Sequence, residues 1–168
     1  MTTHMDGDAI IRYLNRYDFD TVTLPFHLRD TSRANAVAYC AERGIGVIAM
    51  NPLAGGALAK PAPVLQSIAK SLGFESMTEA ALRFLITYPG VTTALAGITY
   101  ADQAVEDAAA IGKGKIPQHV SDELLAKVQE LYANVQHFCT VCKSCEEKCP
   151  NRLPVSELMA AAKEKWPS

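Results

Sequence analysis

The sequence predicts an α/β protein built on a parallel sheet, and two observations carry this prediction. Strand-like and helix-like segments alternate through the first two-thirds of the 168 residues, and short turns rich in Gly, Pro and Asn join them. Residues 45–53 form a near-continuous apolar run, which is typical of parallel strands that are covered on both faces. Such alternation indicates right-handed βαβ units, and therefore a parallel sheet.

The expected elements follow one another regularly along the first 112 residues. Apolar residues at helical spacing predict the helices, and short apolar runs between turn residues predict the strands. Gly44 and Gly112 stand where helices are expected to end. The series is a helix at 6–17, a strand at 21–27, a helix at 32–44, a strand at 45–53, helices at 64–73 and 77–89, a third buried strand at 91–97, and a helix at 101–112.

The composition changes after Gly112, where a short basic linker containing a proline begins. The next helix is predicted over residues 121–135, with Ser121 as its N-cap and two acids in its first turn. A segment rich in cysteine follows, and a short helix at 155–165 is expected near the end. We therefore divide the chain into residues 1–112, 113–138 and 139–168.

The charge balance excludes several classes of partner. Lys and Arg number 16 against 18 acids, which gives a formal charge of −2 and no basic surface for nucleic acid or an anionic membrane. No apolar run approaches the ~18 residues of a membrane span. The first residues lack a basic stretch followed by an apolar one, so no secretory signal is visible. We expect a cytoplasmic protein.

Four of the five cysteines are clustered near the end of the chain. They follow the pattern C-x2-C-x2-C-x3-C and precede Pro150, a run typical of bacterial [4Fe–4S] ligation. Zinc is the second interpretation, although zinc sites usually place two cysteine pairs a dozen or more residues apart. Disulfides are the third, in a chain without an export signal. The predicted metal ligands are Cys139, Cys142, Cys145 and Cys149.

The fourth ligand is the open point of this hypothesis. In ferredoxins with two clusters, the last cysteine of such a run binds the other cluster. Cys149 therefore closes its own cluster, or Cys40 or a cysteine of another chain takes its place. For Cys40 we prefer the reading of a small, buried helix residue.

Three stretches of the sequence together resemble a known family. The run GIGVIAMNPLAGGAL, the run LRFLITYPGVTTALAGITYADQAVED and the segment CTVCKSCEEKCPNRLPVSEL are similar to the C-terminal half of aldo-keto reductases. The resemblance is strongest to the branch with a ferredoxin-like [4Fe–4S] extension. It implies a partial (β/α)8 TIM barrel, about strands six to eight, followed by a small helical iron–sulfur segment.

The resemblance also implies that the chain lacks the family's catalytic Asp, Tyr, Lys and His, which lie in the first half of the barrel. A closed barrel needs ~200–250 residues, and only 112 precede the linker. A lone tyrosine without a partner that lowers its pKa is no general acid. We assign no catalytic residue, and we expect no carbonyl reduction by this chain alone.

The nicotinamide cofactor site, in contrast, is partly retained according to the resemblance. The loop after the seventh strand would contact the pyrophosphate, and the loop and helix after the eighth would hold the adenosine. Met50 stands where an aromatic residue commonly stacks on the nicotinamide, and neither Gly97 nor Gln103 supplies the basic pair that grips the 2′-phosphate of NADP. The predicted cofactor residues are Met50, Asn51, Pro52, Leu53, Gly55, Gly97, Ile98, Thr99, Gln103, Glu106 and Asp107.

Two functional hypotheses from different classes follow. The first is an iron–sulfur oxidoreductase of the aldo-keto reductase type, which binds NAD(P) and needs an N-terminal half or self-association to complete its site. The second is a non-enzymatic electron-transfer or interaction module with a redox partner. A truncated product without activity of its own is the third reading. The open edges of a three-stranded sheet predict that the isolated chain self-associates or folds only marginally in its first 112 residues.

Overall fold

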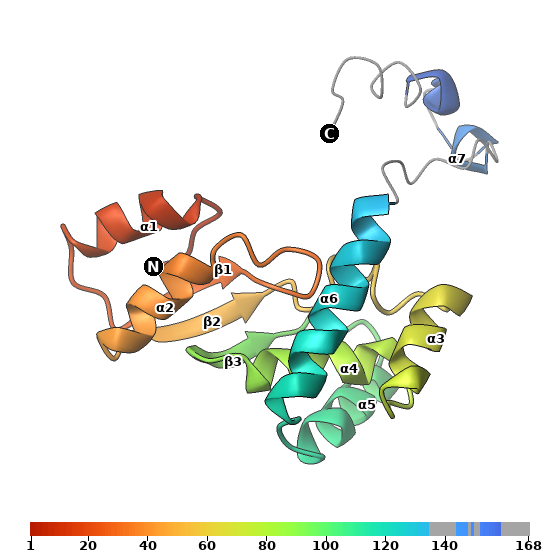
Figure 1. Ribbon diagram of the computed structural model, residues 1–168. Helices are drawn as coiled ribbons and strands as arrows, with labels where there is room; N and C mark the ends of the chain where they lie inside the picture. The colour runs from red at the N-terminus through yellow and green to blue at the C-terminus, as the bar shows by residue number, and fades with distance from the viewer. Residues whose placement is uncertain (135–143, 148, 150–151, 159–168) are drawn as a thin grey trace. The chain divides into compact units, whose positions relative to one another are not determined.

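The computed structural model describes residues 1–134, 144–147, 149 and 152–158, and Figure 1 shows their course. The chain forms two compact units, Met1–Gln129 and Glu130–Ser168. The predicted sheet lies in the first unit. The predicted cysteine segment lies in the second, and Cys139 and Cys142 fall outside the described residues.

Three short strands form the sheet: β1 (Thr21–Pro25), β2 (Gly46–Met50) and β3 (Val91–Leu95). Both pairs are parallel and the order is β1-β2-β3 (Figure 1). Helices separate the strands along the chain, as the alternating pattern predicts. The α/β class and the partial parallel sheet are therefore confirmed.

The segment before the first helix extends this sheet, which the sequence analysis did not predict. Thr2 forms a parallel bridge with Thr23 of β1. The Thr3 amide donates to the Thr23 carbonyl at 2.9 Å, and the Thr23 amide donates to the Met1 carbonyl at 2.7 Å. Residues 1–3 therefore pair in parallel with β1, along the edge that does not pair with β2.

Seven helices are described, and local chemistry explains where several begin and end. Asp6 caps α1 by accepting from the Ala9 amide at 2.7 Å. Ser76 caps α4 in the same way, accepting from the Glu79 amide at 3.1 Å. Gly44, with φ +69°, ends the α2 region as predicted. The helices are α1 (Gly7–Leu14), α2 (Ala34–Glu42), α3 (Pro63–Ser71), α4 (Met77–Thr87), α5 (Ala101–Gly112), α6 (Gln118–Asn134) and α7 (Ser144–Glu147).

One predicted helix start is wrong, and one predicted helix end is confirmed. Ser121 is no N-cap, because α6 begins at Gln118 and the Ser121 amide donates to the Pro117 carbonyl at 3.1 Å. The proline supplies the turn, so the helix begins earlier than its first favourable capping residue. Gly112, in contrast, is the last residue of α5, as predicted, and Gly114 with φ +77° makes the turn that follows.

The core of the first unit lies on one face of the sheet. Val22 and Val47 are paired neighbours and fully buried, as are Leu24 and Ala49. Helix α2 contacts β2 and helix α4 contacts β3, so these two helices cover this face. On the other face Leu95 is 60% exposed.

The expectation that the apolar strands are covered on both faces is therefore wrong. Buried and half-buried residues alternate along β2, and β3 is largely exposed rather than buried. The physical reason is that, among the described residues, helices cover only one side of the sheet and β3 pairs only with β2. In contrast, Cys40 is fully buried in α2, as predicted.

The second unit is described at α7, at residue 149 and at residues 152–158. Glu146 accepts hydrogen bonds from the amide of Ser156, at 2.8 Å, and from its hydroxyl group. Residues 155–158 are helical, and the rest of the helix predicted to residue 165 lies outside the described residues. Within the described parts of both units, we find no helix with the length and apolar content needed to cross a membrane.

Candidate functional site

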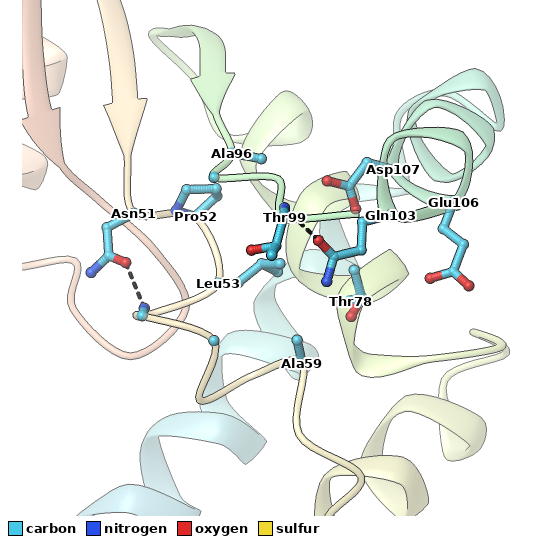
Figure 2. A pocket seen from close by; sticks show the side chains of 13 residues that line it. Asn51, Pro52, Leu53, Ala59, Thr78, Ala96, Thr99, Gln103, Glu106 and Asp107 are labelled. Atoms are coloured by element: carbon cyan, nitrogen blue, oxygen red, sulfur yellow. Dashed lines mark hydrogen bonds between the residues drawn. The ribbon is translucent and has the colours of Figure 1, made fainter. Parts of the chain in front are cut away.

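A pocket of about 480 Å³ opens beyond the carboxyl ends of β2 and β3 (Figure 2). This edge of a parallel sheet is where α/β proteins commonly bind ligands. The volume lies within the range of small-molecule sites. The pocket is lined by Asn51, Pro52, Leu53, Gly55, Gly56, Ala59, Thr78, Ala96, Gly97, Thr99, Gln103, Glu106 and Asp107.

A tightly wound turn after β2 forms one wall of the pocket. Asn51, Ala54, Gly55 and Gly56 all have positive φ angles, between 52° and 82°. The Asn51 side chain holds the turn together, because its Oδ1 accepts from the Gly55 amide at 2.5 Å (Figure 2). Non-glycine residues rarely adopt positive φ, and such strain is concentrated at binding sites.

This turn leaves backbone donors beside the pocket. The Ala54 amide is bonded to the Asn51 carbonyl, whereas the amides of Leu53 and Gly56 have no acceptor in the described part of the chain. Backbone N–H groups gathered in such a turn form a site for an anion, because they supply partial positive charge without a side chain. The turn therefore has the chemistry of a phosphate site.

The loop after β3 and the start of α5 form the opposite wall. Gln103 folds back on this loop, and its Oε1 accepts from the Thr99 amide at 2.8 Å and from the Tyr100 amide at 3.2 Å. Figure 2 shows Gln103 and Thr99 joined by the first of these bonds, facing Leu53. The loop is thereby held by the helix that follows it.

Acidic side chains dominate the charge of this second wall. Glu106 and Asp107 line the pocket, and none of its lining residues is a Lys or an Arg. Burial raises the pKa of Asp107, and the neighbouring Glu106 carboxylate raises it further. The α5 wall is therefore electronegative, in contrast to the amide-rich turn across from it.

A smaller pocket of about 300 Å³ shares Thr78 and Glu106 with the first. Its one lining cation, Lys113, is engaged by two carboxylates: Nζ lies 2.8 Å from Glu75 Oε1 and 3.1 Å from Glu79 Oε2. This positive charge is neutralised within the protein and adds little to the potential of the larger pocket.

The structure brings together most of the predicted cofactor residues. All of them line the pocket except Met50 and Ile98. Met50 ends β2 and is half-buried, whereas Ile98 is 51% exposed. Four further lining residues are not among the predicted cofactor residues: Gly56, Ala59, Thr78 and Ala96. Only Gly56 belongs to a recognisable motif, as the second glycine of the NPLAGG turn.

Only part of the predicted metal site lies within the described residues. Cys139 and Cys142 lie outside the described residues, and the Cys145 side chain is likewise not described. Among the described residues, no three His, Cys, Asp or Glu side chains come together as metal ligands. Cys149 is described, and its Sγ accepts a hydrogen bond from the Leu153 amide at 3.5 Å.

Relatives were found by sequence and by structure. Residues 8–129 match the model of the aldo/keto reductase family, so the cysteine segment lies beyond the matched range. An uncharacterized oxidoreductase of Schizosaccharomyces pombe is 31% identical over 105 residues, which cover 62% of this chain and 32% of that protein. The chain thus spans about one third of this relative.

Solved structures share the fold. Aldo-keto reductase AKR11C1 from Bacillus halodurans, in its apo form, superposes with a TM-score of 0.64 at 19% identity, covering 75% of this chain and 49% of that one. The thermostable aldo-keto reductase Tm1743, in complex with the inhibitor epalrestat, gives 0.57 at 17% identity, with coverage of 75% and 46%. The fold is therefore similar to about half of a reductase barrel, and this chain belongs to the aldo/keto reductase family.

Proposed function

We propose that the pocket binds a nicotinamide dinucleotide, and that the chain is the cofactor-binding part of an oxidoreductase of the aldo-keto reductase type. The observation that carries this proposal is the pocket itself. The amides of Leu53 and Gly56, which have no acceptor among the described residues, lie on a turn across the pocket from a polar helix wall, at the carboxyl end of a parallel sheet. Phosphate groups bind such amides, and hydroxyl and amide groups of a nucleoside find partners on the polar wall.

In the same proposal, the catalytic residues do not belong to this pocket. We assign no catalytic residue. The exposed face of the sheet, where Leu95 is 60% exposed, has no cover among the described residues. In this proposal a further segment of polypeptide, either an N-terminal half or a second copy, completes the site, and carbonyl reduction requires it. A cytoplasmic location stays a prediction.

Binding of NADH to the purified chain tests the cofactor proposal. We expect saturable binding, measured by calorimetry or by the change in NADH fluorescence. Asn51→Ala should weaken it, because the Asn51 side chain holds the turn through the Gly55 amide. Asn15→Ala removes the same side chain outside the pocket, at the end of α1, and serves as the control. Absence of binding to the folded chain would refute the proposal.

We also propose that the cysteine segment holds a [4Fe–4S] cluster through Cys139, Cys142, Cys145 and Cys149. Their spacing supports iron–sulfur ligation. The Leu153 amide, which donates to Cys149 Sγ, supports it as well, since backbone hydrogen bonds to the ligand sulfurs tune such clusters. When bound, the cluster would supply one-electron transfer to a redox partner, and its ligation energy would also stabilise the segment.

Iron and acid-labile sulfide, determined on anaerobically purified protein, test this second proposal. Cys149→Ser should lower the iron content, whereas Cys40→Ala should not, because Cys40 is fully buried in the core of the other unit. Retained zinc with no sulfide would refute the cluster. Loss of iron in Cys40→Ala with a normal circular dichroism spectrum would instead assign the fourth ligand to Cys40. A reversible redox wave without NADH binding would favour an electron-transfer module over a reductase part.

A further inference from the structure

We propose that Glu146 is a positioning residue of the cysteine segment: its carboxylate, bonded to Ser156, holds the Cys149 thiolate and the backbone amide that donates to this sulfur. The inference rests on the proposed [4Fe–4S] cluster and specifies how the chain holds one of the ligands. The residues involved all belong to the second unit, Glu130–Ser168, and are described. Glu146 is not itself a predicted ligand and acts through the backbone that it holds.

The chain turns sharply after Cys149 and brings a backbone donor to its sulfur. The Cys149 amide donates to the Glu146 carbonyl at 3.1 Å, and the Arg152 amide donates to the Cys149 carbonyl at 3.0 Å. The next amide, that of Leu153, donates to Cys149 Sγ at 3.5 Å. Arg152 has φ +52°, a conformation that residues with a side chain rarely adopt. Such a turn persists only where surrounding contacts hold it.

The Glu146 side chain supplies a contact of this kind. Its Oε1 accepts from the Ser156 amide at 2.8 Å and from the Ser156 hydroxyl group. This amide lies in the first turn of the helix at 155–158, where backbone amides have no acceptor within the helix. Ser156 is only 7% exposed, so water does not replace the carboxylate unless the segment opens. Hydrogen bonds to a charged acceptor are also stronger than those between neutral groups.

This contact closes a loop around a predicted ligand. Glu146 and Ser156 are ten residues apart in the sequence, and Cys149 and Leu153 lie between them. A second predicted ligand, Cys145, directly precedes Glu146. With both ends of the loop joined, the Leu153 amide stays directed at Cys149 Sγ.

Two effects on a bound cluster follow from this arrangement, and their signs differ. Hydrogen bonds to the ligand sulfurs are one determinant of the reduction potential. An N–H group carries partial positive charge and stabilises the reduced, more electron-rich form, so loss of the Leu153 donor lowers the potential. Removal of the Glu146 carboxylate also removes a negative charge, which by itself raises the potential. A test must therefore separate the contact from the charge.

The chain offers two ways to make this separation. Ser156→Ala removes one donor to Glu146 and leaves every charge in place. Glu147 is the neighbouring acid of α7; it is exposed, and no described residue donates to its carboxylate. Glu147→Ala therefore removes the same charge as Glu146→Ala without breaking the contact, and is the matched control.

The midpoint potential and the rate of iron release to a chelator, measured on the anaerobically purified full chain, test the inference. We expect Ser156→Ala to lower the potential and to release iron about threefold faster or more, as the loss of one hydrogen bond implies. Ser156→Thr keeps the hydroxyl group and should behave as the unchanged protein. Glu146→Ala should have a lower potential and a faster release than Glu147→Ala. Glu146→Gln, which keeps an uncharged acceptor, should release iron at an intermediate rate.

The outcomes separate this inference from the proposal beneath it. Equal potentials and equal release rates in Glu146→Ala and Glu147→Ala would overturn the positioning role while leaving the cluster in place. Unchanged values in Ser156→Ala would overturn it as well. If the unchanged chain holds no iron and sulfide, the proposed cluster fails and the inference falls with it. Should Glu146→Ala not take up iron, Ser156→Ala still decides, because it keeps the carboxylate and its bond to the backbone.

Discussion

The buried carboxylate of Glu79 joins α4 to the end of α5, and its loss should be costly. Glu79 is 5% exposed. Its Oε1 accepts from Arg83 Nη1 at 2.9 Å, and its Oε2 accepts from Lys113 Nζ and from the Glu75 amide, each at 3.1 Å. Arg83 in turn donates from Nε to the Gly114 carbonyl at 2.9 Å. The network holds Lys113 and Gly114, the two residues directly after α5.

The two ion pairs of Glu79 contribute unequally to the free energy of unfolding, because the Arg83 side chain is more buried than that of Lys113. The Arg83 side chain is only 16% exposed, so removing its partner leaves a nearly buried cation unpaired. We expect Glu79→Ala to lower the free energy of unfolding by about 3 kcal/mol. Lys113 is 38% exposed, and water screens its pair. Lys113→Met should therefore cost only about 0.5 kcal/mol.

The assay is urea unfolding followed by circular dichroism, with the slope of the transition as a control for two-state behaviour. A cost for Glu79→Ala no larger than that for Lys113→Met would refute the reasoning. The pH dependence gives a second check. Burial acts to raise the pKa of Glu79, but the hydrogen bonds from Glu75, Lys113 and Arg83 outweigh it and hold the pKa below 4.5. The contribution is thus present above pH 4.5 and should vanish as the pH falls through the lowered value.

Three further predictions concern other parts of the first unit. Burial lowers the pKa of His27 below 6.5, so the unfolded chain binds the proton first, and the free energy of unfolding should fall as the pH drops below that value; His27→Gln should flatten this dependence in urea titrations. Gly90→Ala should cost more than about 1 kcal/mol in the same assay, because φ is +89° and the added Cβ would lie 3.0 Å from the Val37 side chain; a neutral effect would contradict the tight approach. Asn51→Gly should keep the positive φ but lose the bond to the Gly55 amide, and should weaken NADH binding less than about tenfold while raising proteolysis of the turn.

The sequence was sufficient for the parts of the fold that depend on local pattern. The alternation of strands and helices, the Asp6 start of α1 and the Gly44 turn all follow from single residues and their spacing, and the structure agrees with them. Ser121 shows the limit of such reasoning. A good capping residue does not begin a helix when the proline four residues earlier has already turned the chain.

Burial could not be predicted in the same way, because it depends on what covers a strand. The apolar residues of β2 and β3 predict cover on both faces, yet Leu95 is 60% exposed. The bridge between Thr2 and Thr23 could not be predicted either, because a segment of three residues is too short to show a periodic pattern. For the site, the NPLAGG turn could be found from its glycines. Thr78 could not, because it reaches the pocket from a helix distant in sequence.

The proposed cofactor binding and the proposed catalysis depend on different parts of the fold. Every residue that lines the pocket lies between Asn51 and Asp107, within the range that matches the family. The pocket therefore depends on contacts made inside the first unit, such as the Gln103 bond to the loop after β3. In the proposed enzyme, further polypeptide covers the face of the sheet that the described residues leave exposed. Dinucleotide binding should consequently survive in the isolated chain, whereas carbonyl reduction should appear only when that face is covered.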